Sequence, residues 1–309
     1  MKKIFTLIAA MALTTGALFA QDLNEATETF NNALTAFQEG NKASALESFN
    51  KALTMAKGLG EDGAALVSDC QGTIPKVLLS MAKDLIKEGK YDEAVAKLNE
   101  TATIATEYKA DDVAEEAEEL VPQVLMQKGN GLLKTDPAAA AAVYQQILDT
   151  DPTNGVAALR LGAAYNAAGK ADEAIKAFEL AAANGQEATA KKQLSNVYLK
   201  QASSLLKEKK YADAVTAALK CNECSPNPTA LQIAGQASQL GGKNSDAIKY
   251  FSEYLEAAPT AKNAGQIAYT VGALYQQAGN NTKAKEYYQK AMSDPKYGAE
   301  AKKLFDALK

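Results

Sequence analysis

The 309-residue sequence contains no histidine, three cysteines and one arginine, and these shortages exclude several classes of function. Without histidine the chain has no Ser-His-Asp or Cys-His arrangement to activate a nucleophile, no histidine ligand for a metal and no CxxCH haem attachment. It also has no glycine-rich loop of the kind that cradles a phosphate. We therefore expect a protein that is not an enzyme and that uses no cofactor or metal.

The scarcity of arginine bears on possible partners. Arg160 is the only arginine, and the formal net charge of the chain is −4. A protein that binds nucleic acid is expected to carry a basic stripe, preferably rich in arginine. The acidic run from Asp111 to Glu119 lacks the glycine and the alternating oxygen ligands of a calcium loop, and its spacing favours a solvated helix face. We expect neither nucleic acid nor calcium as a ligand.

Long apolar runs are missing except near the start of the chain. Two lysines there precede an uncharged run at residues 4–19, and Ala20 follows it. This order predicts a secretory signal peptide at residues 1–20, cleaved near Ala20. An uncleaved anchor is the alternative, but the run is interrupted by threonine and glycine and is shorter than the about 20 apolar residues of a spanning helix. We expect a periplasmic or secreted protein with no transmembrane segment after cleavage.

In place of those features, the sequence has one pattern that occurs seven times. The fourth copy is the fullest, LGAAYNAAGKADEAIKAFELA at residues 161–181. In each copy a small residue is followed four positions later by an apolar one. The small residues are Ala45, Ala94, Ala140, Ala174, Ala214, Ala247 and Ala284, and their followers are Phe49, Leu98, Tyr144, Phe178, Ala218, Phe251 and Tyr288. Such a period predicts a stack of similar structural units.

These residues resemble the tetratricopeptide repeat family, whose unit is a helix-turn-helix of 34 residues with L-G-x2-Y, A-x3-F and P signatures. The resemblance extends from about residue 23 to the end of the chain and is most specific in the fourth, sixth and seventh copies. It implies an all-α fold, a right-handed superhelical solenoid of about seven helix pairs. The last helical run, AEAKKLFDAL, then serves as the C-terminal capping helix.

The early copies are longer than the later ones. Pro75 and Pro122 lie in the extra length, and two interpretations are open: long helices that contain the prolines, or new helices that begin at them. We divide the chain after the signal peptide into two regions. Residues 21–152 hold helix pairs with extended helices, and residues 153–309 hold the regular repeats and the capping helix.

Cys221 and Cys224 form a CxxC pair, which is a redox spacing in an exported chain. Cys221 takes the position of a small packing residue in other copies, which favours a buried thiol. Residues three apart on a helix hold their Cβ atoms about 5–6 Å apart, too far for a relaxed disulfide. Pro226 would allow the helix end to unwind and a disulfide to close. Redox catalysis is a third interpretation, although no thioredoxin-like strand pattern surrounds the motif.

The resemblance places a partner-binding groove on the first helix of each pair, on the face away from the second helix. Gln232, Gln236 and Gln239 are spaced four and three apart, so they share one helix face. Their amides carry donors and acceptors that suit an extended peptide backbone or a glycan, although ordinary soluble surface is the alternative. The predicted groove residues are Asn166, Asn196, Gln232, Gln236, Gln239, Gln266, Tyr269 and Gln276.

These observations lead us to expect a non-enzymatic scaffold or adaptor for protein–protein interaction in the bacterial cell envelope, with an exported protein or peptide as its partner. The alternative is a glycan- or small-ligand-binding accessory protein of an envelope transport or polysaccharide assembly system. Some members of the family capture a C-terminal carboxylate with a clamp of lysine, asparagine and arginine. Phe30 and Leu34 stand where the first copy would need that clamp, so this ligand is not transferred.

Overall fold

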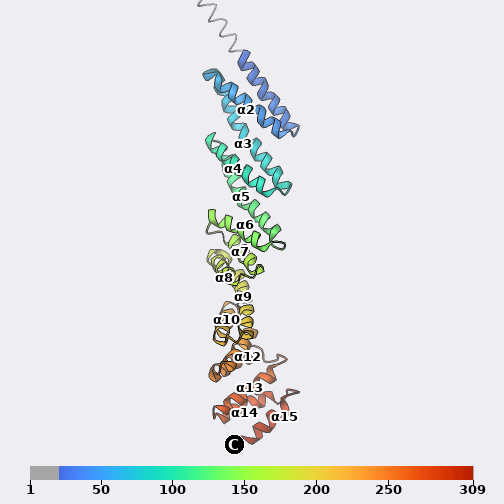
Figure 1. Cartoon of the computed structure of the whole chain (residues 1–309), viewed down its shortest axis with the longest axis vertical. Coiled ribbons are helices and arrows are strands. Elements are labelled where there is room, and N and C mark those ends of the chain that lie inside the picture. The colour runs from blue at the N-terminus through green and yellow to red at the C-terminus, as the bar shows by residue number, and fades with distance from the viewer. Residues whose placement is uncertain (1–20, 309) are drawn as a thin grey trace, which may run out of the picture. The chain divides into compact units, whose positions relative to one another are not determined.

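The structure is a computed structural model that describes residues 21–308. The predicted signal peptide therefore lies outside the described residues. Over the described range the chain forms helices joined by short turns and has no β-strand, and the helices follow one another in chain order (Figure 1). The predicted all-α fold of successive helix pairs is confirmed.

The helices match the predicted repeats. The first described helix occupies residues 21–38. It is followed by α2 (Lys42–Gly58), α3 (Ala64–Lys87), α4 (Tyr91–Glu107), α5 (Asp111–Leu132), α6 (Pro137–Thr150), α7 (Gly155–Ala167), α8 (Ala171–Ala181), α9 (Glu187–Lys207), α10 (Tyr211–Cys224), α11 (Pro228–Leu240), α12 (Asn244–Ala257), α13 (Ala264–Gln277), α14 (Asn281–Ala291) and α15 (Gly298–Ala307). Two short segments, η1 (Gly60–Gly63) and η2 (Ala182–Gln186), connect α2 to α3 and α8 to α9.

The packing divides the chain into two compact units between Gly131 and Leu132. The division falls at the end of α5, so the two helices of the third predicted pair, α5 and α6, belong mainly to different units. The change in repeat length in the sequence suggested a boundary later in the chain, at residue 152.

In the first unit, long helices carry two apolar core clusters. The core of α2 packs against α3, and that of α3 and α4 packs against α5. Pro75 and Pro122 lie inside α3 and α5, which are 24 and 22 residues long. The interpretation as long helices that contain the prolines is therefore correct, and new helices that begin at them are not formed. Ile74 and Val77 on either side of Pro75 are buried, and this burial offsets the hydrogen bond that the proline removes.

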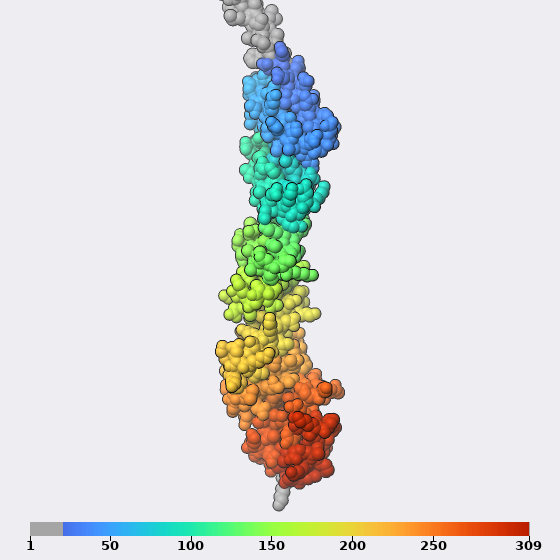
Figure 2. Space-filling view, turned by 45° about the vertical axis from the view of Figure 1, so that its right-hand side comes forward, coloured from blue at the N-terminus to red at the C-terminus, as the bar shows by residue number. Residues whose placement is uncertain are grey.

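In the second unit, short helices pack in regular pairs. Each helix from α6 to α14 contacts its neighbours in the chain, and α15 packs on α14. Figure 2 shows the outer surface of the later helices, coloured orange to red. Asn227 begins α11 by accepting hydrogen bonds from the backbone N–H groups of Thr229 and Ala230, and Pro228 takes the first helical position.

Three glycines set the spacing within these pairs. A Cβ atom added to any of them would lie less than 3.0 Å from a ring carbon of the paired helix, so only glycine allows this approach. The glycine–ring pairs are Gly162 with Phe178, Gly235 with Phe251 and Gly272 with Tyr288. The seven small residues of the repeated pattern are all completely buried, which confirms the predicted register.

The last helix, α15, covers the end of the second unit. Ala301 is buried, and Leu304 and Phe305 pack against the cluster around Tyr288. Lys302 and Asp306 are exposed and form an ion pair on the outer side. One apolar face and one charged face are what a terminal helix of a repeat stack requires, so the predicted cap is confirmed.

Candidate functional site

The predicted glutamine face lies on α11. Gln232 and Gln236 are half-buried and Gln239 is exposed, whereas Ala234 and Ala237 on the other side of the helix are buried. The buried side packs against α10 and α12. The three amides therefore lie together on the less buried side of the helix, as the spacing of four and three predicts.

The α11 amides form no hydrogen bond with other described residues. Each amide offers two N–H donors and an oxygen with two lone pairs. Polar groups that are partly removed from water normally find a partner, because leaving them unpaired costs free energy. Gln232 and Gln236 thus present unused hydrogen-bonding groups at a half-buried surface, where a ligand or water can satisfy them.

On α13 the predicted residues occupy the same register as those on α11. Tyr269 lies three residues before Gly272, and Gln276 lies four residues after it. Gln232 and Gln239 have the same offsets from Gly235. Since each glycine faces the ring of its own paired helix, residues at matching positions lie on the same side of α11 and α13. Both helices also pack against α12, and we call their two faces together the α11–α13 face.

Two of the α13 residues also take part in internal packing. Gln276 accepts a hydrogen bond from the Tyr288 hydroxyl at 2.6 Å. The ring of Tyr269 lies between two others, with centroids 5.8 Å from Tyr288 and 5.3 Å from Tyr297. Burial and the nearby Tyr269 raise the pKa of Tyr288, so its phenol stays protonated and can donate this hydrogen bond. Contact of Tyr269 with a partner stays a prediction.

The other predicted residues are spread over separate helices. Gln266 is exposed on the first turn of α13, Asn166 is half-buried near the end of α7, and Asn196 is exposed in the middle of α9. Asn166 and Asn196 lie outside the two helices that form the α11–α13 face. Their part in binding a partner stays a prediction.

Sequence reasoning missed two exposed apolar side chains on first helices. Leu240 at the end of α11 is 61% exposed and directly follows Gln239, and Val156 near the start of α7 is 47% exposed. Both stand at helix ends, where an apolar residue in a repeat is easily assigned to the core. Their positions relative to Gly235 and Gly162 could have shown that they point outward.

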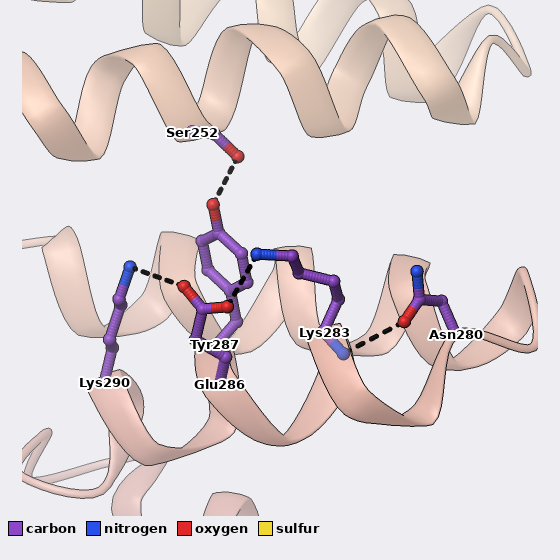
Figure 3. A network of polar contacts seen from close by, with 6 residues as sticks. All are labelled: Ser252, Asn280, Lys283, Glu286, Tyr287 and Lys290. Atoms are coloured by element: carbon purple, nitrogen blue, oxygen red, sulfur yellow. Dashed lines mark hydrogen bonds and ion pairs between the residues drawn. The ribbon is translucent and has the colours of Figure 1, made fainter.

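The polar residues of the second helices contrast with these amides, as Figure 3 shows for α14. The Tyr287 hydroxyl donates to Ser252 Oγ on α12 at 2.8 Å, and the Lys290 ammonium lies 4.5 Å from the centroid of the Tyr287 ring. Glu286 pairs with both Lys283 and Lys290, and its hydrogen bond from Lys283 lowers its pKa. The Tyr287–Ser252 hydrogen bond thus joins α14 to α12, and the ion pairs of Glu286 lie within α14.

Beside this network the structure has a hollow of about 510 Å³ between α12, α13 and α14. Its wall carries charges of both signs, Glu256 and Lys262 among them, together with the Tyr287 side chain. Neither Glu256 nor Lys262 belongs to an ion pair within the described part of the chain. The hollow has the size of a site for a small polar molecule.

All three cysteines are free thiols in this structure. Cys221 is completely buried, in the predicted packing position, and its Sγ lies 3.2 Å from Ser195 Oγ. Burial raises the pKa of the Cys221 and Cys224 thiols, and it raises that of Cys70 to about 11. The thiols are therefore protonated and weakly nucleophilic at neutral pH. A disulfide between Cys221 and Cys224 stays a prediction for oxidising conditions.

The acidic run of α5 forms a solvated face, as its spacing predicts. Its six carboxylate side chains are all exposed, and Glu116 pairs with Lys83 of α3. Over residues 21–308, no three metal-binding side chains gather closely enough to hold an ion.

The second unit matches known repeat sequences. Three family models described as tetratricopeptide repeat match residues 132–196, 199–262 and 265–293. A comparison with curated proteins found no match.

Several solved structures match part of this chain. One is YrrB, described as a TPR protein with an unusual peptide-binding site; it is 22% identical, and the match covers 58% of this chain and 91% of YrrB with a TM-score of 0.35. A MamA structure is 19% identical, with 59% and 96% covered and a TM-score of 0.37. PilF of Pseudomonas aeruginosa is 19% identical, with 59% and 80% covered and a TM-score of 0.29.

Proposed function

Since the chain belongs to the tetratricopeptide repeat family, we propose that it is a non-enzymatic scaffold that binds another protein or a peptide on the α11–α13 face. Tetratricopeptide repeats bind proteins or peptides. The observation that carries the proposal is the set of α11 amides, Gln232, Gln236 and Gln239, which point away from the core and have no hydrogen-bond partner among the described residues.

The contrast between first and second helices supports this choice of face. Ser252 of α12 and Glu286 of α14 bond to neighbouring residues, so a partner at these two side chains would have to displace existing contacts. The glutamines of α11 require no such exchange. Their donors and acceptors match those of a peptide backbone, which offers one N–H and one C=O at almost every residue.

The place of action that we propose is the bacterial cell envelope, after export. The support is the lysine, apolar run and alanine order of residues 1–20. Among residues 21–308, no helix is both long and apolar enough to cross a membrane. Cell fractionation with sequencing of the mature N-terminus tests this part: a chain that begins at Gln21 in the exported fraction supports it, and a full-length chain in the cytoplasm contradicts it.

Crosslinking in living cells tests the binding face. A photoreactive residue at Gln236 should capture one dominant protein, and the same residue at the exposed Lys249 of α12 should not. Changing Gln232 and Gln239 to alanine should reduce capture at Gln236, because these side chains supply the hydrogen bonds. The proposal is contradicted if both positions capture equal amounts of protein, or if the two alanine substitutions leave the amount captured at Gln236 unchanged.

The hollow beside α12 and α14 favours a second candidate function, the binding of a glycan or another small polar ligand. Its mixed charges and its volume of about 510 Å³ suit such a molecule. Calorimetry with cell-wall and polysaccharide fragments tests it, with Glu256→Gln and Lys262→Gln as variants that should weaken binding. If none of the fragments binds, this candidate function is rejected.

A further inference from the structure

Charged side chains are distributed unevenly over the second unit. Helices α11 and α13, 13 and 14 residues long, contain no Asp, Glu, Lys or Arg. Their paired helices carry four each: Asp246, Lys249, Glu253 and Glu256 on α12, and Lys283, Lys285, Glu286 and Lys290 on α14. Because 23% of all residues are charged, a helix of this length would hold about three at the average of the chain.

The lack of charge does not come from burial. A helix without charges is usually buried on all sides. Here Gln239, Leu240, Gln266 and Gln277 are exposed, and Gln232 is half-exposed. The open surface of both helices therefore consists of amides and a few apolar groups, where a charged residue would serve solubility equally well. The chain keeps this surface neutral although it faces outward.

We propose that the α11–α13 face binds an uncharged, extended stretch of polypeptide. This inference rests on the proposed function and adds the chemistry of the partner. A charged side chain placed against the face would lose part of its hydration and meet no opposite charge on α11 or α13, which costs free energy. A neutral stretch loses little, because its backbone can exchange water for the amides of Gln232 and Gln236. The face thus selects against charged segments.

Leu240 and Tyr269 distinguish a polypeptide from a sugar chain as the occupant. The exposed Leu240 beside Gln239 offers an apolar contact for one side chain of a peptide. A sugar ring would need a free aromatic face, but Tyr269 is flanked by the rings of Tyr288 and Tyr297. The aromatic group of the face is thus used in packing, and amides with an apolar contact remain for the ligand.

A selection experiment tests the chemistry of the partner. A random library of dodecapeptides is displayed on phage and selected on the full chain. Binders are then sorted by whether they lose affinity for a variant in which Gln232, Gln236 and Gln239 are alanine. A matched control carries alanine at Gln146 and Gln289, which are exposed glutamines of α6 and α14. We expect the peptides that depend on the α11 glutamines to contain fewer charged residues than the library.

Salt and introduced charge give a second readout. The dissociation constant of the selected peptides should change less than about twofold between low and high salt, since screening acts on charge pairs. Gln236→Lys and Gln236→Glu should both weaken binding by about tenfold or more, because either charge is desolvated without a counter-charge. A charged partner would instead respond in opposite directions to the two substitutions.

The outcomes separate this inference from the function on which it rests. A binder can depend on the α11 glutamines and yet be rich in charged residues, lose affinity strongly in high salt, or bind one charged variant more tightly. Any of these results contradicts the uncharged partner but agrees with the proposed scaffold function. Failure to obtain any binder that depends on these glutamines overturns both. Competition by a neutral N-acetylglucosamine tetramer in place of peptides overturns the polypeptide occupant.

Discussion

The two units hold neighbouring helices together by different contacts. In the second unit, aromatic rings lie against glycines of the paired helix, and its ion pairs join residues no more than four apart among the described residues. In the first unit, three ion pairs connect different helices: Lys42 with Asp84, Lys83 with Glu116, and Lys128 with Asp92. At the position of the glycines, its first two pairs have the buried Ala33 and Ala82.

These contacts differ in the free energy that they contribute and in how closely the two helices must approach each other. The side chains of the three ion pairs are between 22% and 81% exposed, so each pair contributes at most about 1 kcal/mol. A buried ring such as Phe251 contributes several kcal/mol, but only if the facing residue has no side chain. Regular short pairs thus depend on glycine, while the long helices of the first unit tolerate more variation in approach.

The largest expected effect is that of Gly235→Val. A valine Cβ and its methyl groups would collide with the Phe251 ring, which is 1% exposed and has no room to move away. We expect the second unit to lose about 3 kcal/mol of stability. Hydrogen exchange followed by mass spectrometry should show the loss in peptides from α11 and α12.

A matched substitution in the first unit shows whether the difference between the units is real. Ala82→Val tests the same register opposite Leu98, which can change its rotamer more easily than a ring. It should cost less than Gly235→Val, and adding Phe251→Ala to Gly235→Val should recover part of the lost stability. An equal cost in both units would contradict the special role of the glycines.

A smaller effect of opposite sign is expected for Ser238→Ala. Ser238 is buried in α11, and its Oγ has no hydrogen-bond partner among the described residues. Removing this hydroxyl should stabilise the second unit by about 1 kcal/mol, because an unpaired buried donor is costly. Ser195→Ala is the control, since the Ser195 hydroxyl lies 3.2 Å from Cys221 Sγ and its loss should be destabilising. Urea unfolding measures both changes.

The repeated small residues and their apolar followers are predictable from the sequence, because each residue acts within its own helix pair. Ala174 and Phe178 therefore lie where their spacing places them. The outward direction of Gln232 and Gln236 follows from helix geometry alone. The prolines left two interpretations open, since a buried environment decides whether a helix continues through Pro75.

Contacts that depend on the next element along the chain were not predictable. The contact of the Tyr269 ring with the Tyr297 ring requires the path of the α14–α15 turn, which no pattern in the sequence fixes. The exposure of Leu240 likewise depends on where the next pair leaves space. Local periodicity thus determines the helix face on which a residue lies, and packing between helix pairs determines which residues it contacts.

Lys209→Gly should stabilise the second unit by about 0.5–1 kcal/mol. Lys209 has a φ of 62° in the turn between α9 and α10, where the turns of other pairs have glycines such as Gly169 and Gly279. Glycine adopts this left-handed conformation without steric cost. The reverse substitution, Gly169→Lys, should lower stability by a similar amount in thermal unfolding. If both substitutions shift stability in the same direction, backbone strain is not the cause.

The smallest effect concerns the ion pairs of the first unit. The hydrogen bond from Lys42 lowers the pKa of Asp84, so the pair stabilises the fold above the unfolded pKa of aspartate, about 3.9, and loses this contribution as the pH falls through the lower folded value. Asp84 is 40% exposed, so Asp84→Asn should cost less than about 1 kcal/mol at pH 7.

The difference between the wild-type chain and Asp84→Asn should shrink when unfolding is measured in acid, and it should also shrink in high salt. Glu187→Gln in α9 is the control from the second unit, because the exposed Glu187 pairs with Lys191 of its own helix and bridges no helices. If this control changes stability as much as Asp84→Asn does, ion pairs between helices do not distinguish the first unit, and its long buried helices alone account for its cohesion.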